Sequence, residues 1–164
     1  MKGEKVMKEE KKLSVVVPCY NEERNVGVFY NELIKVFQDY SVILEVIFIN
    51  DGSKDNTLME LKKLLTNKES EIKILALSRN FGKESAIYAG LEASTGDFVA
   101  IIDADMQQNP ALLKDMLNIL VSESDYDSVA LYQEQRKEGF ILSFFKRRFY
   151  NIINKMSEID FFQG

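Results

Sequence analysis

The chain contains no histidine and no tryptophan, and Cys19 is the only cysteine among its 164 residues. Without histidine the protein has no imidazole metal site, no Ser-His-Asp triad and no imidazole pH switch. A single cysteine also excludes an internal disulfide. Any metal ion bound by this chain would therefore be held by oxygen ligands.

Long apolar runs and a surplus of basic residues are also lacking. No apolar run approaches the ~20 residues that cross a bilayer, and residues 1–12 are rich in Lys and Glu, without the apolar centre of a secretion signal. The formal net charge of −5 argues against a nucleic-acid partner. We therefore expect a cytoplasmic protein with a flexible leader at 1–12 and enough apolar residues for one domain with a core.

Short β-branched runs alternate with segments whose apolar residues have helical spacing. Strands are expected at 13–17, 42–49, 72–77, 98–102 and 127–132, and helices at 22–38, 55–65, 82–93 and from Pro110. This alternation predicts an α/β fold with a mainly parallel central sheet and helices on both faces. Ligands of such sheets bind beyond the carboxyl ends of the strands.

Two carboxylates, Asp103 and Asp105, follow the expected strand at 98–102. Alternate residues of a strand point to the same side, so both carboxylates can face one point. Two anions at the end of a buried strand repel each other unless a cation lies between them. Mg²⁺ or Mn²⁺ would suit this position, because such ions take oxygen ligands and leave places for phosphate. A solvated loop with two acids is the alternative interpretation of so short a motif.

The turn after the first expected strand, residues 18–22, contains no glycine. A dinucleotide-binding dehydrogenase fold needs a glycine-rich turn there, and a P-loop needs its own glycines and a Gly-Lys-Ser/Thr sequence. Neither is present, which makes a dehydrogenase improbable. A divalent ion at the acid pair would instead neutralise a diphosphate and improve it as a leaving group.

Four motifs occur in order: Val-Val-Pro-Cys-Tyr-Asn-Glu-Glu at 16–23, Asn-Asp-Gly-Ser-Lys-Asp-Asn-Thr at 50–57, Leu-Ser-Arg-Asn-Phe-Gly-Lys-Glu at 77–84 and Ile-Asp-Ala-Asp-Met-Gln at 102–107. In order and spacing they resemble the family-2 glycosyltransferases, above all dolichol-phosphate mannose synthases and bactoprenol glucosyltransferases. The resemblance covers about residues 13–150. It implies a GT-A type fold, a nucleotide-sugar donor, Mg²⁺ or Mn²⁺, and transfer with inversion.

The resemblance also implies roles for individual residues. The nucleotide would be bound by Pro18, Tyr20, Glu22, Asp51, Lys83, Asp103 and Ala104. The metal would be held by Asp103, Asp105 and Gln107. Catalysis would depend on Asp103, Asp105 and Arg136, the last of which would stabilise the leaving group.

Each role competes with a simpler structural one. Tyr20 would stack on the base, or else cover the rim of the core, and Asp51 would contact the base edge, or else start the Asp-Gly turn. Lys83 would bind phosphate or be a solvated lysine, and Gln107 would be a metal ligand or a polar loop residue. Glu22 can both bind the ribose or base and act as a first-turn acid of a helix.

The chain departs from the look-alikes in three places. The loop at 106–110 has one acid fewer, the region before Arg136 has one arginine fewer, and the chain ends at Gly164, where the look-alikes continue into an acceptor half. We therefore expect a fragment with a donor-binding domain at 13–135 and the start of an acceptor half at 136–164. The alternative hypothesis is a non-catalytic nucleotide-binding or assembly module.

Residues 139–156 mix Phe and Ile with Lys and Arg. This pattern is typical of a basic amphipathic helix on an anionic membrane surface, and packing on the sheet is the alternative. Exposed aromatic residues there would also favour self-association into a homo-oligomer. The resemblance implies a polyprenyl-phosphate acceptor at the inner face of the membrane, and it favours a UDP-sugar over a GDP-sugar as the donor.

Overall fold

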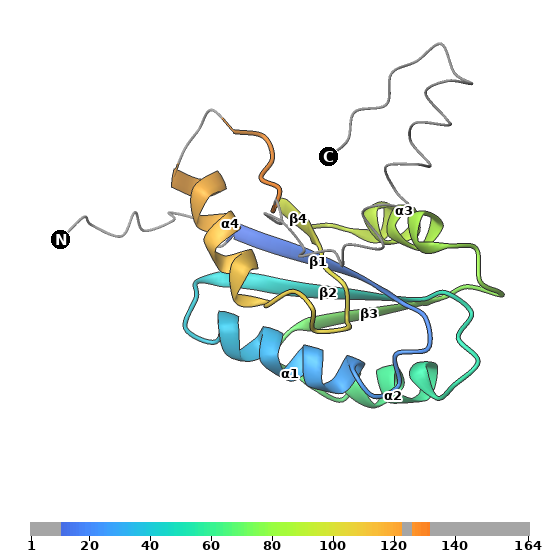
Figure 1. Cartoon of the computed structure of the whole chain (residues 1–164). Coiled ribbons are helices and arrows are strands. Elements are labelled where there is room, and N and C mark those ends of the chain that lie inside the picture. The colour runs from blue at the N-terminus through green and yellow to red at the C-terminus, as the bar shows by residue number, and fades with distance from the viewer. Residues whose placement is uncertain (1–10, 123–125, 132–164) are drawn as a thin grey trace, which may run out of the picture. The chain divides into compact units, whose positions relative to one another are not determined.

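The computed structural model of the chain describes residues 11–122 and 126–131. Its centre is a parallel four-stranded sheet in the order β3-β2-β1-β4 (Figure 1). The strands are β1 (Lys11–Cys19), β2 (Val42–Asn50), β3 (Glu71–Ala76) and β4 (Phe98–Ile101). The two central strands, β1 and β2, are nearly continuous runs of buried residues, as expected for a parallel sheet covered on both faces.

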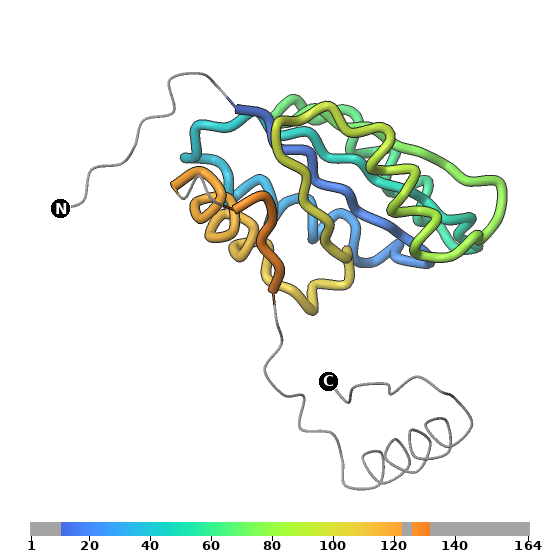
Figure 2. The backbone as a smooth tube through the Cα atoms, turned by 90° about the horizontal axis from the view of Figure 1, so that it is seen from above, coloured from blue at the N-terminus to red at the C-terminus, as the bar shows by residue number. Residues whose placement is uncertain are grey.

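Four helices connect or follow the strands: α1 (Val26–Phe37), α2 (Thr57–Leu64), α3 (Lys83–Ala93) and α4 (Ala111–Ser122). The first two and α4 cover one face of the sheet and α3 covers the other, over β1 and β2 (Figures 1 and 2). Successive residues of β1 point to opposite faces of the sheet. Val15 and Val17 pack in the larger hydrophobic core on one face, and Val16 packs in the smaller core on the other. The predicted α/β fold with helices on both faces is confirmed.

The first strand runs through Pro18, although we expected it to stop there. Proline lacks the N–H that a central strand normally donates. The carbonyl of Val16 accepts from the backbone N–H of Ile102, so the backbone groups of Val16 and Pro18 face the β4 side. The pairing of β4 with β1 ends at Val16, and Pro18 therefore interrupts no ladder.

Several element boundaries differ from the expected ones. The strand β1 begins at Lys11, so two residues assigned to the leader belong to the sheet, where Lys11 and the backbone of Lys12 bind Asp97. Helix α1 begins at Val26 rather than at residue 22, and α2 at Thr57 rather than at residue 55. Both shifts occur because the preceding residues form hydrogen-bonded loops at the edge of the sheet.

The prediction of a fifth strand at 127–132 is wrong for residues 127–131, which the structure describes. Residues 127–131 have no strand structure and are mostly exposed, so no strand partner holds them. The chain divides into two compact units, 1–129 and 130–164, and the second lies almost wholly outside the described residues. Three expectations fall outside the described residues and stay predictions. They are the domain boundary at 135, the role of Arg136 and the amphipathic segment at 139–156.

None of the helices in the described part of the chain has the length and apolar content that crossing a bilayer requires.

Candidate active site

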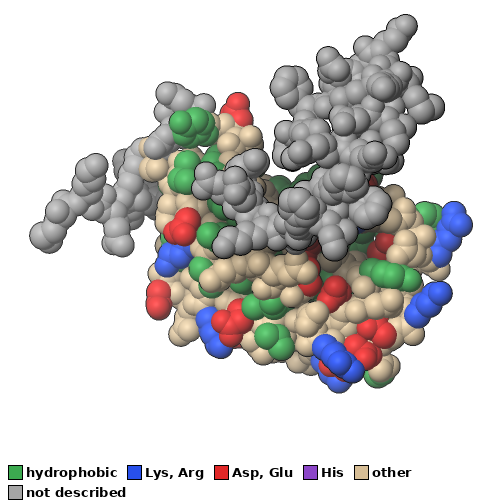
Figure 3. Space-filling view, viewed as in Figure 1, with side chains coloured by type: hydrophobic (Ala, Val, Ile, Leu, Met, Phe, Trp, Pro, Cys, Tyr) green, Lys and Arg blue, Asp and Glu red, His purple; other side chains and the backbone are tan. Residues whose placement is uncertain are grey.

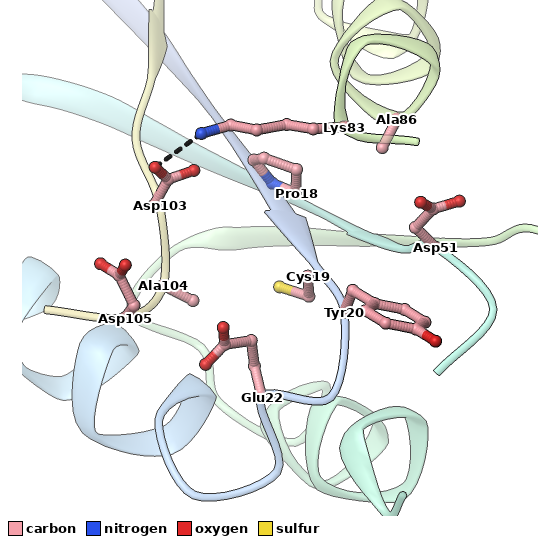
Figure 4. Close-up of a pocket in the computed structure, with 10 residues that line it drawn as sticks. All are labelled: Pro18, Cys19, Tyr20, Glu22, Asp51, Lys83, Ala86, Asp103, Ala104 and Asp105. Atoms are coloured by element: carbon pink, nitrogen blue, oxygen red, sulfur yellow. Dashed lines mark hydrogen bonds and ion pairs between the residues drawn. The ribbon is translucent and has the colours of Figure 1, made fainter. Parts of the chain in front are cut away.

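A pocket of about 230 Å³ lies at the carboxyl ends of the parallel strands. It is lined by Pro18, Cys19, Tyr20, Glu22, Asp51, Lys83, Ala86, Asp103, Ala104 and Asp105 (Figure 4). These residues come from the ends of β1 and β2, the start of α3 and the segment after β4. The structure therefore brings together every residue expected to bind the nucleotide. Gln107 does not line the pocket, although it lies two residues beyond Asp105.

The two aspartates of the Asp-x-Asp motif face the pocket together (Figure 4). Ile102 and Ala104 are buried in the core, while Asp103 and Asp105 are partly exposed on the other side. The backbone N–H of Ile102 still donates to β1, which keeps the segment extended beyond the end of β4. The period of two in an extended chain thus places both carboxylates on the pocket side.

Lys83, the first residue of α3, reaches across the pocket to Asp103. The ammonium Nζ lies 2.7 Å from the Oδ2 of Asp103 (Figure 4). We had expected Lys83 to meet a phosphate or to be solvated, and in the structure its partner is a carboxylate. The lysine therefore already neutralises one of the two acids in the motif.

Asp51 is buried, and both of its carboxylate oxygens accept backbone hydrogen bonds. The N–H of Phe81 donates to one at 2.8 Å and the N–H of Gly82 to the other at 3.0 Å. These bonds tie the end of β2 to the residues directly before α3. They therefore fix the position of Lys83, the first residue of that helix. Asp51 also lines the pocket, so its expected contact with a base stays a prediction beside this structural role.

Gly52 allows the loop before α3 to pass close to the end of β2. Its φ is +62°, and a Cβ there would lie 2.5 Å from the backbone nitrogen of Asn80. Arg79 and Phe81 in the same loop make a cation–π contact of 4.7 Å from the guanidinium carbon to the ring centroid. Arg79 and Asn80 thus belong to a packed loop.

Replacing Gly52 with alanine should therefore destabilise the protein by about 2 kcal/mol, through backbone strain and displacement of this loop. Gly27 in α1 is the matched control, because a Cβ there meets nothing within 4 Å. Gly27→Ala should stabilise by about 0.5 kcal/mol through its better helix propensity. Urea denaturation of both variants measures the difference, and similar changes of the same sign would contradict this role of Gly52.

The loop that carries Tyr20 and Glu22 is held by hydrogen bonds to the loop after β2. The backbone N–H of Glu22 donates to the hydroxyl of Thr57 at 2.7 Å. Asn21, which has a φ of +58°, donates from its N–H to Ser53 and accepts from the N–H of Lys54. The half-exposed ring of Tyr20 borders the pocket, as Figure 4 shows.

Sequence reasoning missed the roles of Glu23, Ser53 and Thr57 in supporting this loop. The carboxylate of Asp55 accepts from the N–H of Thr57 and from that of Glu23, and Glu23 accepts in turn from the N–H of Asn56. The carboxylate of Glu22 accepts from the side chain of Asn25 at 2.6 Å. The available signal was the density of Asn, Asp, Ser and Thr in the first two motifs, because such side chains bind loop backbone.

Cys19 lies beneath the pocket and is buried. Burial raises the pKa of its thiol far above the ordinary value, and the charges of Glu22 and Asp103 raise it further. The thiol is therefore protonated at neutral pH and is no nucleophile.

The pocket lining carries a strong excess of negative charge. It contains four carboxylates, those of Glu22, Asp51, Asp103 and Asp105, and the single ammonium of Lys83. On the face seen in Figure 3, acidic side chains reach the middle while Lys and Arg lie toward the rim. A diphosphate would be repelled by this lining unless a further cation came with it.

The acid pair fits a hard divalent ion that is shared with a ligand. Among the described residues, no group of three or more His, Cys, Asp or Glu side chains is placed to hold a metal ion. Asp103 and Asp105 line the pocket together and would be the carboxylate ligands of an ion bound there. Mg²⁺ is commonly bound by one or two carboxylates together with phosphate oxygens and water, which matches this donor set.

An acid pair and an aromatic side chain thus border one pocket at the carboxyl edge of a buried parallel sheet. Residues 14–161 match the model of the family described as "Glycosyl transferase family 2", and the chain belongs to this family. The sequence-based identification of the family is confirmed.

Two curated relatives illustrate the similarity. The chain is 38% identical to the "Putative glycosyltransferase CsbB" of Bacillus subtilis, over 93% of this chain and 45% of that protein. It is 33% identical to the "Prophage bactoprenol glucosyl transferase homolog" of Escherichia coli, over 89% and 47%. The chain therefore spans a little less than half the length of these relatives.

Solved structures support the same fold. Staphylococcus aureus TarS 1–349 in complex with UDP has a TM-score of 0.60 and 28% identity, over 77% of this chain and 40% of that chain. The mannosyltransferase PcManGT of Pyrobaculum calidifontis, in complex with GDP-Man and Mn²⁺, has a TM-score of 0.50 and 25% identity, over 60% and 28%. The predicted GT-A type fold is thus confirmed.

Proposed function

We propose that this chain is the donor-binding part of an enzyme that transfers a sugar from a nucleotide diphosphate to polyprenyl phosphate, with a divalent metal ion. The observation that carries the proposal is the pocket itself. It joins Asp103 and Asp105 to Tyr20 and Asp51 at the carboxyl edge of a parallel sheet. The relatives include a "Dodecaprenyl-phosphate galacturonate synthase" of Rhizobium johnstonii, whose acceptor supports the choice of a lipid phosphate.

The nucleoside would occupy the side of the pocket formed by Pro18, Tyr20, Glu22 and Asp51. The exposed ring of Tyr20 can stack on a base, and the carboxylate of Glu22 can accept from a ribose hydroxyl. Asp51 would contact the base edge with lone pairs not used by its two backbone donors. Ala104 lines the pocket between the two acids, and its small side chain leaves room for a ligand beside the backbone.

The diphosphate would lie against the acid pair. Asp103 and Asp105 would hold Mg²⁺ or Mn²⁺, with Gln107 as a further oxygen donor. A bound ion would neutralise the diphosphate and improve it as a leaving group. Lys83 and Arg136 would add positive charge to the same phosphates. The need for a cation follows from the excess of carboxylates around the pocket.

The acceptor would attack the anomeric carbon from the side opposite the departing diphosphate, which inverts the configuration. A lipid phosphate is anionic at neutral pH, so the attack needs little help from a base. We place this reaction at the inner surface of the membrane, where residues 139–156 would contribute a basic amphipathic segment.

We favour UDP over GDP in the donor. The choice rests on the similarity to the bactoprenol glucosyltransferases, among them the Escherichia coli homolog that is 33% identical to this chain.

Calorimetric titration of UDP and GDP, each with and without Mn²⁺, tests this function. We expect UDP to bind at least about tenfold more tightly with Mn²⁺, because the ion removes the repulsion between diphosphate and carboxylates. GDP should bind more weakly under both conditions. Absence of binding by either nucleotide to the folded protein would contradict a donor site, and tighter binding of GDP would contradict the choice of base.

A further inference from the structure

The ion pair between Lys83 and Asp103 places a cation where the donor's metal ion would have to bind. We infer that Lys83 is an exchangeable counter-ion, which neutralises Asp103 in the ligand-free protein and moves to the donor's phosphate when a divalent ion takes Asp103. This inference deepens the proposed function and rests on it. It gives one lysine two alternating partners in the same pocket.

The geometry allows the exchange. The ammonium lies 2.7 Å from Asp103, yet 55% of the Lys83 side chain and 32% of the Asp103 side chain are exposed to solvent. Exposed ion pairs contribute little net free energy, equivalent to at most about a fivefold change in an equilibrium constant. A divalent ion can therefore displace the ammonium at small cost. The flexible four-carbon stem of lysine lets the ammonium move while the helix stays in place.

The backbone of Lys83 is held in a fixed position, whereas its long side chain is more than half exposed. Asp51 accepts the N–H groups of Phe81 and Gly82, the two residues directly before α3. Because both bonds have good geometry and Asp51 is buried, the Cα of Lys83 has a defined position at the pocket edge. Asp51 thus acts as a positioning residue for the lysine, in addition to any contact with the nucleotide.

The exchange couples the binding of metal to the binding of nucleotide. A metal ion alone must displace Lys83 from Asp103 and leave the ammonium beside a new positive charge. A metal ion that arrives with a diphosphate supplies an anion for the displaced ammonium. Metal and nucleotide should therefore each raise the affinity for the other, and removal of Lys83 should reduce this coupling.

The substitution Lys83→Met separates this inference from a plain phosphate-binding role. It should bind Mn²⁺ alone more tightly, by roughly threefold to fivefold, because the competing ammonium is gone. It should bind UDP with Mn²⁺ more weakly, by roughly tenfold, because one charge-assisted hydrogen bond to phosphate is lost. A lysine that only binds phosphate would give the second effect without the first.

The matched control is Lys62→Met, which removes the same charge from an exposed position on α2, away from the pocket. Electron paramagnetic resonance of free Mn²⁺ gives the affinity for the metal alone, and calorimetry gives the affinity for UDP with Mn²⁺. The expected result is opposite shifts in Lys83→Met and no shift in Lys62→Met. Unchanged or weaker Mn²⁺ binding in Lys83→Met would overturn the exchange, as would failure of both proteins to bind Mn²⁺.

Titration of UDP without metal distinguishes failure of the exchange from failure of the proposed function. Wild-type protein that binds UDP but shows no exchange keeps its donor site and loses only the role of Lys83. Wild-type protein that binds no nucleotide under any condition loses the proposed function and the exchange with it. Tighter Mn²⁺ binding by Lys83→Met would then show only that the lysine and the metal ion compete for Asp103.

Discussion

Asp105→Asn is expected to abolish metal-dependent nucleotide binding and to leave the fold intact. Asparagine keeps the size of the side chain and an oxygen that can accept from the backbone N–H of Gln107, which lies 3.0 Å from Oδ1 of Asp105. The substitution removes the negative charge and replaces one acceptor oxygen with an NH₂ group. A metal site with so few protein carboxylates should lose at least about a hundredfold in affinity, since even outer-shell changes cost ten- to a hundredfold.

Asp105 is the better of the two aspartates for this test. The carboxylate of Asp103 is paired with Lys83, so a change there disturbs an ion pair as well as a metal ligand. Within the described residues, Asp105 has no lysine or arginine partner. Its loss should therefore report on metal binding alone.

Calorimetric titration of UDP with Mn²⁺ measures the effect, with circular dichroism and thermal melting as checks on the fold. Asp115→Asn is a matched control, because Asp115 is an exposed carboxylate on α4 and lies outside the pocket. It should bind like the wild type. If Asp105→Asn binds UDP and Mn²⁺ with unchanged affinity, the ion lies elsewhere and the assignment of the acid pair is wrong.

The order of strands and helices could be predicted from the sequence because it follows from local patterns. Four of the five expected strands exist, and the carboxylates at 103 and 105 share a side because an extended chain has a period of two. The exception, 127–132, has strand-like composition. Composition alone does not supply a neighbouring strand, and residues 127–131 pair with none.

The detailed contacts of the site depend on distant backbone groups, which no sequence pattern displays. Asp51 was interpreted as a ligand contact or a turn residue, and the structure shows it binding the loop thirty residues later. For Lys83 the sequence allows a phosphate ligand or a solvated lysine, and its partner Asp103 comes from another strand end. In each case the residue type was informative, and the partner was set by the sheet topology.

Glu45 is a further residue whose role the sequence does not display, because a single charge in an apolar run interrupts the pattern of a buried strand. Its side chain is completely buried in the middle of the sheet. Lys73 lies 2.8 Å away and Lys12 3.1 Å away, both with Nζ facing Oε1. The hydroxyl of Ser14 donates to the same carboxylate, and so do the N–H and hydroxyl of Thr95.

These contacts determine the protonation of Glu45. Burial alone would raise the pKa of the carboxyl, but hydrogen bonds from Lys73, Ser14 and Thr95 outweigh it and hold the pKa well below the usual range. The carboxylate is therefore charged at neutral pH and joins all three strands β1, β2 and β3 through its partners. It lies six residues before Asp51 along β2, roughly 20 Å from the pocket at the rise of a strand.

Glu45→Gln should lower the free energy of unfolding by about 3 kcal/mol at pH 7. Breaking a buried ion pair costs about 3–5 kcal/mol, and the lower end applies because both lysines are partly exposed and can be rehydrated. Urea denaturation measures the change. Glu32→Gln is the matched control, since its pair with Lys35 on the surface of α1 should be worth less than about 0.5 kcal/mol.

The pH dependence of this difference distinguishes a lost charge from a packing defect. Because the pKa of Glu45 is lowered by folding, its contribution is fully present above the unfolded value of about 4.3 and is lost as the pH falls toward the folded value. The gap in stability between wild type and Glu45→Gln should therefore be constant from pH 6 to 8 and shrink below about pH 4. Other carboxylates titrate in both proteins and cancel in the difference. A gap that stays constant down to pH 3 would show that the substitution acts through packing and that the charge of Glu45 adds nothing to the stability of the sheet.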